Sequence, residues 1–264
     1  MKTKILSLAI IFFVAIFFNI SCENPEQPDT QSAEDDARGA LVVSDAFAYS
    51  NSAASADPGK LGIDSTECFT ISFEGFYPDR IITITFDSCV SDAGVVRDGQ
   101  IIVNLNGEWG NGREMTITFN SYSVDGVSVA GAITTTYNLI AENPSFNIKA
   151  ENMTLTFPDE RTIAWTSDKT FLMTEGMNTP LIRLDDIFLI SGTSNGVNRI
   201  GDSYSTEYID VEADKSCEWP KTGIVNITKT DEETTTFDFD QDGSAECDNI
   251  VKVTKGDITI YINL

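Results

Sequence analysis

Two short runs decide the fold of this chain, FTISF at residues 69–73 and ITITF at residues 82–86. In both runs apolar and polar side chains alternate with a period of two, and β-branched and aromatic residues dominate. That pattern is typical of half-buried β-strands. It returns as MTITF at residues 115–119 and as ITIYI at residues 258–262. Segments rich in Gly, Pro, Asn and Asp separate such runs, as expected of turns.

The rest of the chain after residue 63 follows the same rule, since no stretch there keeps the 3.6-residue period of a helix. We therefore expect residues 64–264 to form a single all-β domain, an antiparallel meander of about 12–14 strands joined by short connections. The pattern leaves two arrangements open, a sandwich and a curled or partly closed barrel.

Composition excludes several classes of function. The 264 residues include 17 Lys and Arg against 41 Asp and Glu, a formal net charge of −24. Such a surface repels phosphate backbones, so nucleic acid is not expected as a partner. The chain contains no histidine, which excludes Ser-His-Asp and Cys-His nucleophile systems and histidine-bound zinc or haem. Catalysis would have to rest on carboxylates, Lys, Tyr or Cys.

The first 21 residues are expected to be a lipoprotein signal peptide. Lys2 and Lys4 precede the uncharged run 5–18, which is shorter than the roughly 20 residues that span a bilayer. Ile20-Ser21-Cys22 resembles the lipobox of bacterial lipoproteins, in which the cysteine is acylated and becomes the new N-terminus, although Asn19 stands where leucine is usual. An ordinary signal peptide with an incidental cysteine is the alternative.

Residues 22–63 are interpreted as an acidic tether rich in Pro, Ser and Ala, with little to bury. The runs 40–43 and 47–49 are its candidates for one short helix or strand. Lipidation at Cys22 would anchor the exported protein to the membrane through this tether. We therefore expect it at the outer membrane or the cell surface.

The four remaining cysteines, Cys68, Cys89, Cys217 and Cys247, are expected to form two disulfides, because an even number in an exported chain favours bridges. Register suggests the pairing. A four-residue loop centred on Pro78-Asp79 would place Ile71 opposite Phe86 and Cys68 opposite Cys89. A loop centred on Glu232 would likewise place Val225 opposite Phe239, Ile227 opposite Phe237, and Cys217 opposite Cys247. Directly opposed residues are close enough for a disulfide.

The densest group of carboxylates, at residues 238–246, is a candidate calcium site. Its oxygens come from Asp238, Asp240, Asp242, Ser244 and Glu246. The Asp-x-Asp-x-Asp-Gly opening matches the first half of a calcium loop, but its twelfth position is Asn249 and no helix flanks it. An acidic strand end with a turn at Asp242-Gly243 is the alternative. Calcium is the one cofactor considered.

Carboxylate pairs and aromatic residues offer two further candidate sites. Asp185-Asp186 and Glu232-Glu233 are adjacent pairs, but neighbours on a strand point to opposite faces and cannot alone flank a glycosidic bond. A flat face for stacking sugars could come from aromatic residues, although these are more often core or cross-strand pairs. The candidates are Trp109, Trp165, Trp219, Tyr122, Tyr137, Tyr204 and Tyr208.

A set of short motifs in the β region carries a resemblance to a known family. They are Tyr77-Pro78, residues 82–87 with Cys89, Asp185-Asp186-Ile187, residues 190–193, Asn198-Arg199 with Gly201, residues 216–219, and Cys247-Asp248-Asn249. In this order, across residues 66–264, the chain resembles a family of Bacteroidota lipoproteins. The resemblance implies an exported lipoprotein with β architecture. It implies no catalytic residue.

These observations favour a membrane-anchored β-rich lipoprotein that is not an enzyme and acts as a binding or structural module. The sequence leaves the ligand open, with a glycan or a surface protein as the candidates. The alternative is a carboxylate-dependent glycan hydrolase on the same lipid tether. A cleft lined by two carboxylates would favour the hydrolase, and an exposed aromatic patch would favour the binding module.

Overall fold

The computed structural model describes residues 30–55, 68–76, 78–91, 94–107, 112–141, 143–178 and 183–264. The predicted signal peptide, residues 1–21, and the predicted lipidation site Cys22 lie outside this part of the chain. Within the described residues, no helix has the length and apolar character needed to cross a membrane.

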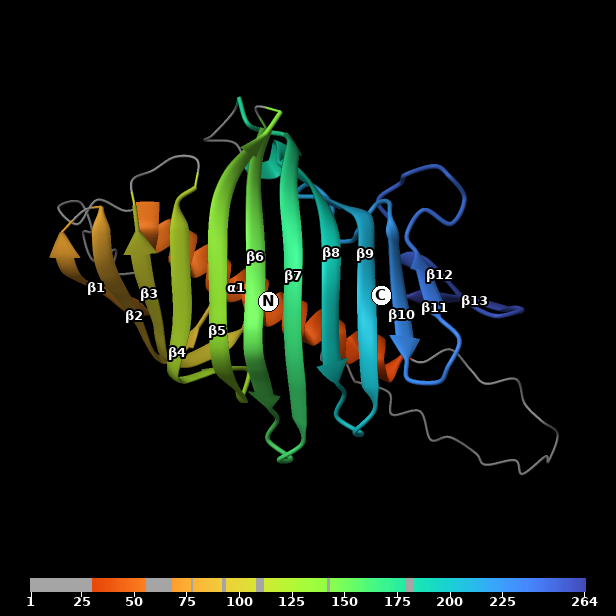
Figure 1. Cartoon of the computed structure of the whole chain (residues 1–264), viewed down its shortest axis with the longest axis horizontal. Helices are drawn as coiled ribbons and strands as arrows, with labels where there is room; N and C mark the ends of the chain where they lie inside the picture. Colours follow the sequence, from red (N-terminus) through yellow and green to blue (C-terminus); the bar gives the residue numbers. More distant parts are fainter. Residues whose placement is uncertain are drawn as a thin grey trace, which may run out of the picture.

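Thirteen antiparallel strands form one sheet in which each strand lies beside its sequence neighbours (Figure 1). The predicted all-β meander is confirmed. The sheet is not closed, because β1 and β13 form its two edges. The strands are β1 (Phe69–Phe76), β2 (Asp79–Val90), β3 (Val96–Asn106), β4 (Glu114–Val124), β5 (Val127–Ile140), β6 (Asn143–Thr156), β7 (Thr162–Glu175), β8 (Ile187–Val197), β9 (Ser203–Asp214), β10 (Ile224–Lys229), β11 (Thr235–Asp238), β12 (Ile250–Lys255) and β13 (Ile258–Asn263).

One helix, α1 (Gln31–Ser55), lies along one face of this sheet (Figure 1). It contacts β2, β3, β4, β6, β7 and β8, and a short 3-10 helix, η1 (Arg183–Asp185), precedes β8. The prediction of a tether with little to bury is therefore wrong for residues 31–55. Together the helix and the sheet face beneath it enclose the core.

The runs 40–43 and 47–49, the candidates for one short helix or strand, lie within α1, where Val42 and Val43 are buried. The rest of the helix was missed because its buried face is small or polar rather than apolar. Gly39, Ala46 and Ala53 are buried beside Asp35 and Asp36. Small side chains let the helix backbone come close to the sheet, and the acidic side chains are buried only because the sheet supplies partners for them. A hydropathy pattern cannot reveal such a face.

The alternation of apolar and polar residues along the strands supplies the sheet's share of the core. Ile82 and Ile84 of β2 and Ile163 of β7 are fully buried, whereas Thr83 and Thr85 on the opposite face of β2 remain partly exposed. Successive side chains of a strand point to opposite faces, so one face of the sheet is apolar beneath the helix and the other is polar.

The first hairpin confirms the disulfide between Cys68 and Cys89, whose Cα atoms are 5.1 Å apart. The predicted register is wrong by two residues: Phe69 pairs with Phe86 and Ile71 with Ile84. Strand pairing continues to Phe76 and Asp79, so the loop is shorter than expected. A bulge between Phe86 and Cys89, with Ser88 at a φ of 47°, returns Cys89 to the buried face, where Cys68 reaches it.

The disulfide between Cys217 and Cys247 is confirmed too, with a Cα–Cα distance of 5.7 Å. Here again the predicted register is wrong by two residues, because Val225 pairs with Phe237 and Ile227 with Thr235. The loop is centred on Asp231, which has a positive φ of 63°. Both cysteines lie outside the strands, so this bridge joins two loops rather than two facing strand positions.

Candidate functional site

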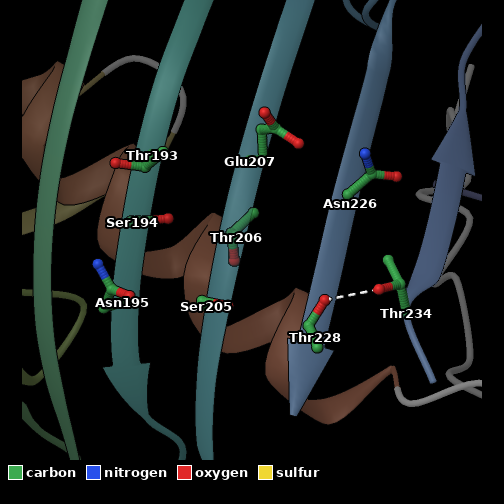
Figure 2. Close-up of a pocket in the computed structure, with 9 residues that line it drawn as sticks. All are labelled: Thr193, Ser194, Asn195, Ser205, Thr206, Glu207, Asn226, Thr228 and Thr234. Atoms are coloured by element: carbon green, nitrogen blue, oxygen red, sulfur yellow. Dashed lines mark hydrogen bonds between the residues drawn. The ribbon is translucent and has the colours of Figure 1, made fainter. Parts of the chain in front are cut away.

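The face of the sheet opposite α1 is polar across β6 to β11, and we call this region the polar outer face. Its exposed or half-exposed side chains are mostly hydroxyls and amides, as Figure 2 shows for β8 to β11 with the helix behind them. The residues of the polar outer face are Lys149, Glu151, Thr166, Asp168, Thr193, Asn195, Ser205, Glu207, Asn226, Thr228 and Thr234.

Two hollows adjoin on this face. One, of about 340 Å³, lies over β8 to β11, and the other, of about 260 Å³, lies over β6 to β8. Thr193 and Asn195 of β8 line both. The two hollows therefore form one continuous polar depression across the strands.

Hydrogen bonds between neighbouring strands fix several of these side chains. Thr228 and Thr234 share a hydrogen bond of 2.8 Å (Figure 2), and Thr236 Oγ1 donates to Asn226 Oδ1 at 2.9 Å. A surface whose polar groups are already oriented loses less conformational entropy when a ligand binds.

Three of the four charged residues of the polar outer face lie together, Lys149, Glu151 and Asp168. The Nζ of Lys149 lies 2.8 Å from Glu151 Oε1, and Lys149 stands directly opposite Asp168 on the neighbouring strand. The hydrogen bond with Glu151 raises the pKa of Lys149. Asp168 also accepts a hydrogen bond of 2.8 Å from Asn147 Nδ2. Both carboxylates of this hollow thus have polar partners.

The covered face of the sheet holds a second cluster, which we call the Asp36 centre: Asp36, Trp165, Lys169, Ser194 and Tyr208. Asp36 Oδ1 accepts hydrogen bonds from Trp165 Nε1 at 2.7 Å and from Ser194 Oγ at 2.6 Å. Asp36 Oδ2 accepts one from Tyr208 Oη at 2.6 Å. The carboxylate is 1% exposed, so these donors replace the water that it loses.

Lys169 completes this centre from β7. Its Nζ lies 3.9 Å from Asp36 Oδ2 and 3.5 Å from the centroid of the Tyr208 ring. Burial lowers the pKa of Lys169 to about 8, against the charge of Asp36, which acts to raise it. Burial and the charge of Asp36 together raise the pKa of Tyr208 well above its ordinary value.

Two further ion pairs hold α1 along its length. Asp35 Oδ1 lies 2.6 Å from Arg199 Nε after β8. Asp45 forms a two-point pair with Arg97, at 2.9 and 2.6 Å, and accepts a hydrogen bond from Tyr122. Basic side chains from the sheet thus meet acidic side chains from the helix. The electrostatic match explains how acidic helix positions face the core.

In the candidate calcium loop, three predicted carboxylates bind the loop's own backbone. Asp238 Oδ1 accepts from the N–H of Asp240, Asp240 Oδ1 from that of Ala245, and Asp242 Oδ1 from that of Ser244. These bonds match the turn interpretation. Among the described residues no group of three or more metal-ligating side chains is assembled.

The predicted aromatic and carboxylate sites are not brought together. Trp165, Tyr122 and Tyr204 are buried in the core, so the hypothesis that they form an open stacking face is wrong. Trp109 lies outside the described residues. Asp185 is at the end of η1, while Glu232 forms ion pairs of 2.8 Å with Lys229 and with Lys255.

Sequence reasoning missed the Asp36 centre, although one signal for it was present. Lys169 keeps the phase of the buried positions Ile163, Trp165 and Ser167 along β7, so alternation alone places a lysine on the core face. A buried lysine requires a partner. Nothing local identifies that partner as Asp36 of a distant helix.

Comparisons with other proteins add no relationship. No protein-family model matches the chain, and searches of curated proteins and of solved structures return no match.

Proposed function

We propose that this protein is an exported lipoprotein, anchored through Cys22 at the outer membrane or cell surface, and that its β-sheet is a non-enzymatic binding or structural module. The observation that carries the binding role is the polar outer face, with two adjoining hollows lined by hydroxyl and amide groups. The two disulfides favour an oxidising compartment and therefore export. The Bacteroidota resemblance agrees with this location.

The proposed ligand is a glycan or a polar patch on a surface protein. Hydroxyl and amide side chains both donate and accept hydrogen bonds, as the hydroxyls of a sugar do. The formal charge of −24 opposes an anionic polymer. The N-terminal lipid would hold the binding face close to the membrane surface.

The test is a binding screen of the Cys22→Ala chain against glycans and surface proteins. Thr193→Ala combined with Asn195→Ala removes two side chains shared by both hollows, and we expect at least a tenfold loss of affinity for any ligand found. Thr116→Ala with Thr118→Ala is the matched control, because these threonines lie on β4 outside the hollows. Equal losses in both double variants, or none in the first, would contradict the proposed face.

One observation favours the alternative, a carboxylate-dependent glycan hydrolase. Glu151 and Asp168 line the same hollow, so two carboxylates do share a depression. Hydrolysis of a glycan by the purified chain, lost in Glu151→Gln and in Asp168→Asn, would support the hydrolase over the binding module.

A further inference from the structure

The Asp36 centre contains the parts of a reaction as well as those of an ion pair. An amine, a carboxylate, two donors to one carboxylate oxygen and a hydroxyl donor to the other are brought together without solvent. We propose that Lys169 and Asp36 condense into an intramolecular amide bond that joins α1 covalently to β7.

Lys169 supplies the nucleophile. Among the described residues, no hydrogen-bond partner reaches its Nζ, which is held over the face of Tyr208 and close to Asp36. The neutral amine is the reactive form. Because burial lowers the pKa of Lys169 to about 8, a proton leaves this amine more readily than it leaves an exposed lysine.

Asp36 supplies the electrophile, and its neighbours activate it. The two donors on Oδ1, Trp165 Nε1 and Ser194 Oγ, lie where negative charge develops when an amine adds to Cγ, as the donors of an oxyanion hole do. Tyr208 donates to Oδ2, the oxygen nearer to Lys169. The raised pKa of Tyr208 keeps its proton available to that oxygen.

The reaction balances without an oxidant, a reductant or a second substrate. A proton first passes from the Lys169 ammonium to the Asp36 carboxylate, which leaves a neutral amine and a carboxylic acid. The nitrogen lone pair then forms the N–Cγ bond. The Cγ–Oδ2 bond breaks, the departing hydroxyl takes a second proton from the nitrogen, and one water molecule leaves. The protein is changed once and does not turn over.

Burial and proximity favour this condensation. Lys169 and Asp36 are 4% and 1% exposed, so the product amide is protected from hydrolysis, and fixed neighbouring groups react as if at very high concentration. The pair Lys149–Glu151 is closer, at 2.8 Å. It is exposed to water, however, and its carboxylate lacks the hydrogen-bond donors that surround Asp36. It therefore serves as the internal comparison.

The bond would give the N-terminal helix a covalent attachment to the sheet. Residues 31–55 lie between the N-terminus and β1, so any pull on the N-terminus reaches α1 first. With the amide in place that force passes directly into β7, at the middle of the sheet. Without it, only hydrogen bonds, ion pairs and packing would hold the helix.

Peptide mass spectrometry tests the proposal. The full chain is purified in detergent, reduced, and digested with trypsin and a glutamate-specific protease. We expect peptide 35–38 joined to peptide 162–175, with a mass one water below the sum of the two and no cleavage after Lys169. A free 35–38 peptide together with normal cleavage after Lys169 would overturn the proposal.

Substitutions distinguish loss of the amide bond from loss of folding. Lys169→Met and Asp36→Ala should abolish the joined peptide, whereas Lys149→Met should leave it intact. Asp36→Asn should still yield the same joined peptide, because ammonia leaves in place of water. Tyr208→Phe should lower the joined fraction several-fold in freshly folded protein. An unchanged joined fraction in Lys169→Met would show that another residue is linked, and would also overturn the assignment.

Discussion

Gly39 of α1 lies against the indole ring of Trp165 on β7, so closely that a Cβ at residue 39 would come within 2.7 Å of the ring carbon Cδ2. The same indole donates through Nε1 to Asp36 Oδ1, which lies about one helical turn earlier, at 2.7 Å. Because Gly39 has no side chain, the helix can lie close to the sheet, and Asp36 can reach its hydrogen-bond donors.

We expect Gly39→Ala to lower the free energy of unfolding by about 1–3 kcal/mol, because the added methyl group collides with a ring that has no free space. This outweighs the roughly 1 kcal/mol by which alanine favours an exposed helix position over glycine. Urea denaturation measures the change. Ser52→Ala, on the exposed side of α1, is the control, and a stabilised Gly39→Ala would show that the helix does not press on Trp165.

Asp45→Ala should be strongly destabilising, by about 3 kcal/mol, because it leaves the guanidinium of Arg97 buried without its carboxylate. The hydrogen bonds of Asp45 raise the pKa of Arg97, and even without them an arginine keeps its proton at neutral pH, so the guanidinium would stay buried and charged. The control is Asp159→Ala, which breaks the exposed pair with Arg161 and should have no measurable effect. Equal effects in the two variants would contradict the role of the helix–sheet ion pair.

Stability should fall as the pH rises above about 10. Burial raises the pKa of Tyr122 and of Tyr208, so both keep their protons in the folded chain where an unfolded tyrosine loses its own, near pH 10. The unfolded state then binds fewer protons, and the free energy of unfolding decreases with pH. Urea midpoints between pH 10 and 12 measure the slope, which Tyr122→Phe should make shallower. Tyr261→Phe, at the exposed edge, should leave the slope unchanged.

Asp240→Ala should lower the melting temperature by a few degrees, because Asp240 Oδ1 accepts the N–H of Ala245 across the acidic loop. Asp240→Asn keeps an acceptor at this position and should retain most of the stability. Melting in millimolar calcium and in chelator separates the two interpretations of this loop. A rise with calcium that both variants abolish would support the calcium site, and equal curves would support the turn.

Cys22→Ala should remove the protein from the membrane fraction, because the acyl chains supply most of the proposed membrane affinity. Ser21→Ala keeps a small residue before the cysteine and should be processed normally. Fractionation followed by immunoblotting measures both outcomes. Normal processing and membrane partition of Cys22→Ala would contradict the lipoprotein interpretation.

The strands and the disulfide partners could be predicted from sequence because their signals are local or simple. Alternation with a period of two depends only on which side chains face the core, so it identified strands such as residues 82–86 directly. The cysteine partners followed from hairpin proximity even though the register was wrong by two residues. A shift of two leaves every side chain on the same face, so the hydrophobic pattern could not expose that error.

Register itself was decided by backbone geometry that composition does not specify. Strand pairing in the first hairpin continues to Phe76 and Asp79, and the bulge at Ser88 returns Cys89 to the buried face of β2. A bulge inserts a residue at a place that only the packing of the whole sheet selects.

The full extent of α1 and the partners in the Asp36 centre depended on tertiary structure. From composition, the acidic residues 34–36 belong in solvent, and alone they would remain there because burying an unpaired charge is too costly. Trp165, Lys169, Ser194 and Tyr208 from β7, β8 and β9 supply the missing partners. Those partners are more than a hundred residues away in sequence, and only the folded sheet brings them together. The sequence by itself determined which segments form strands, whereas the fold decided which charges could be buried.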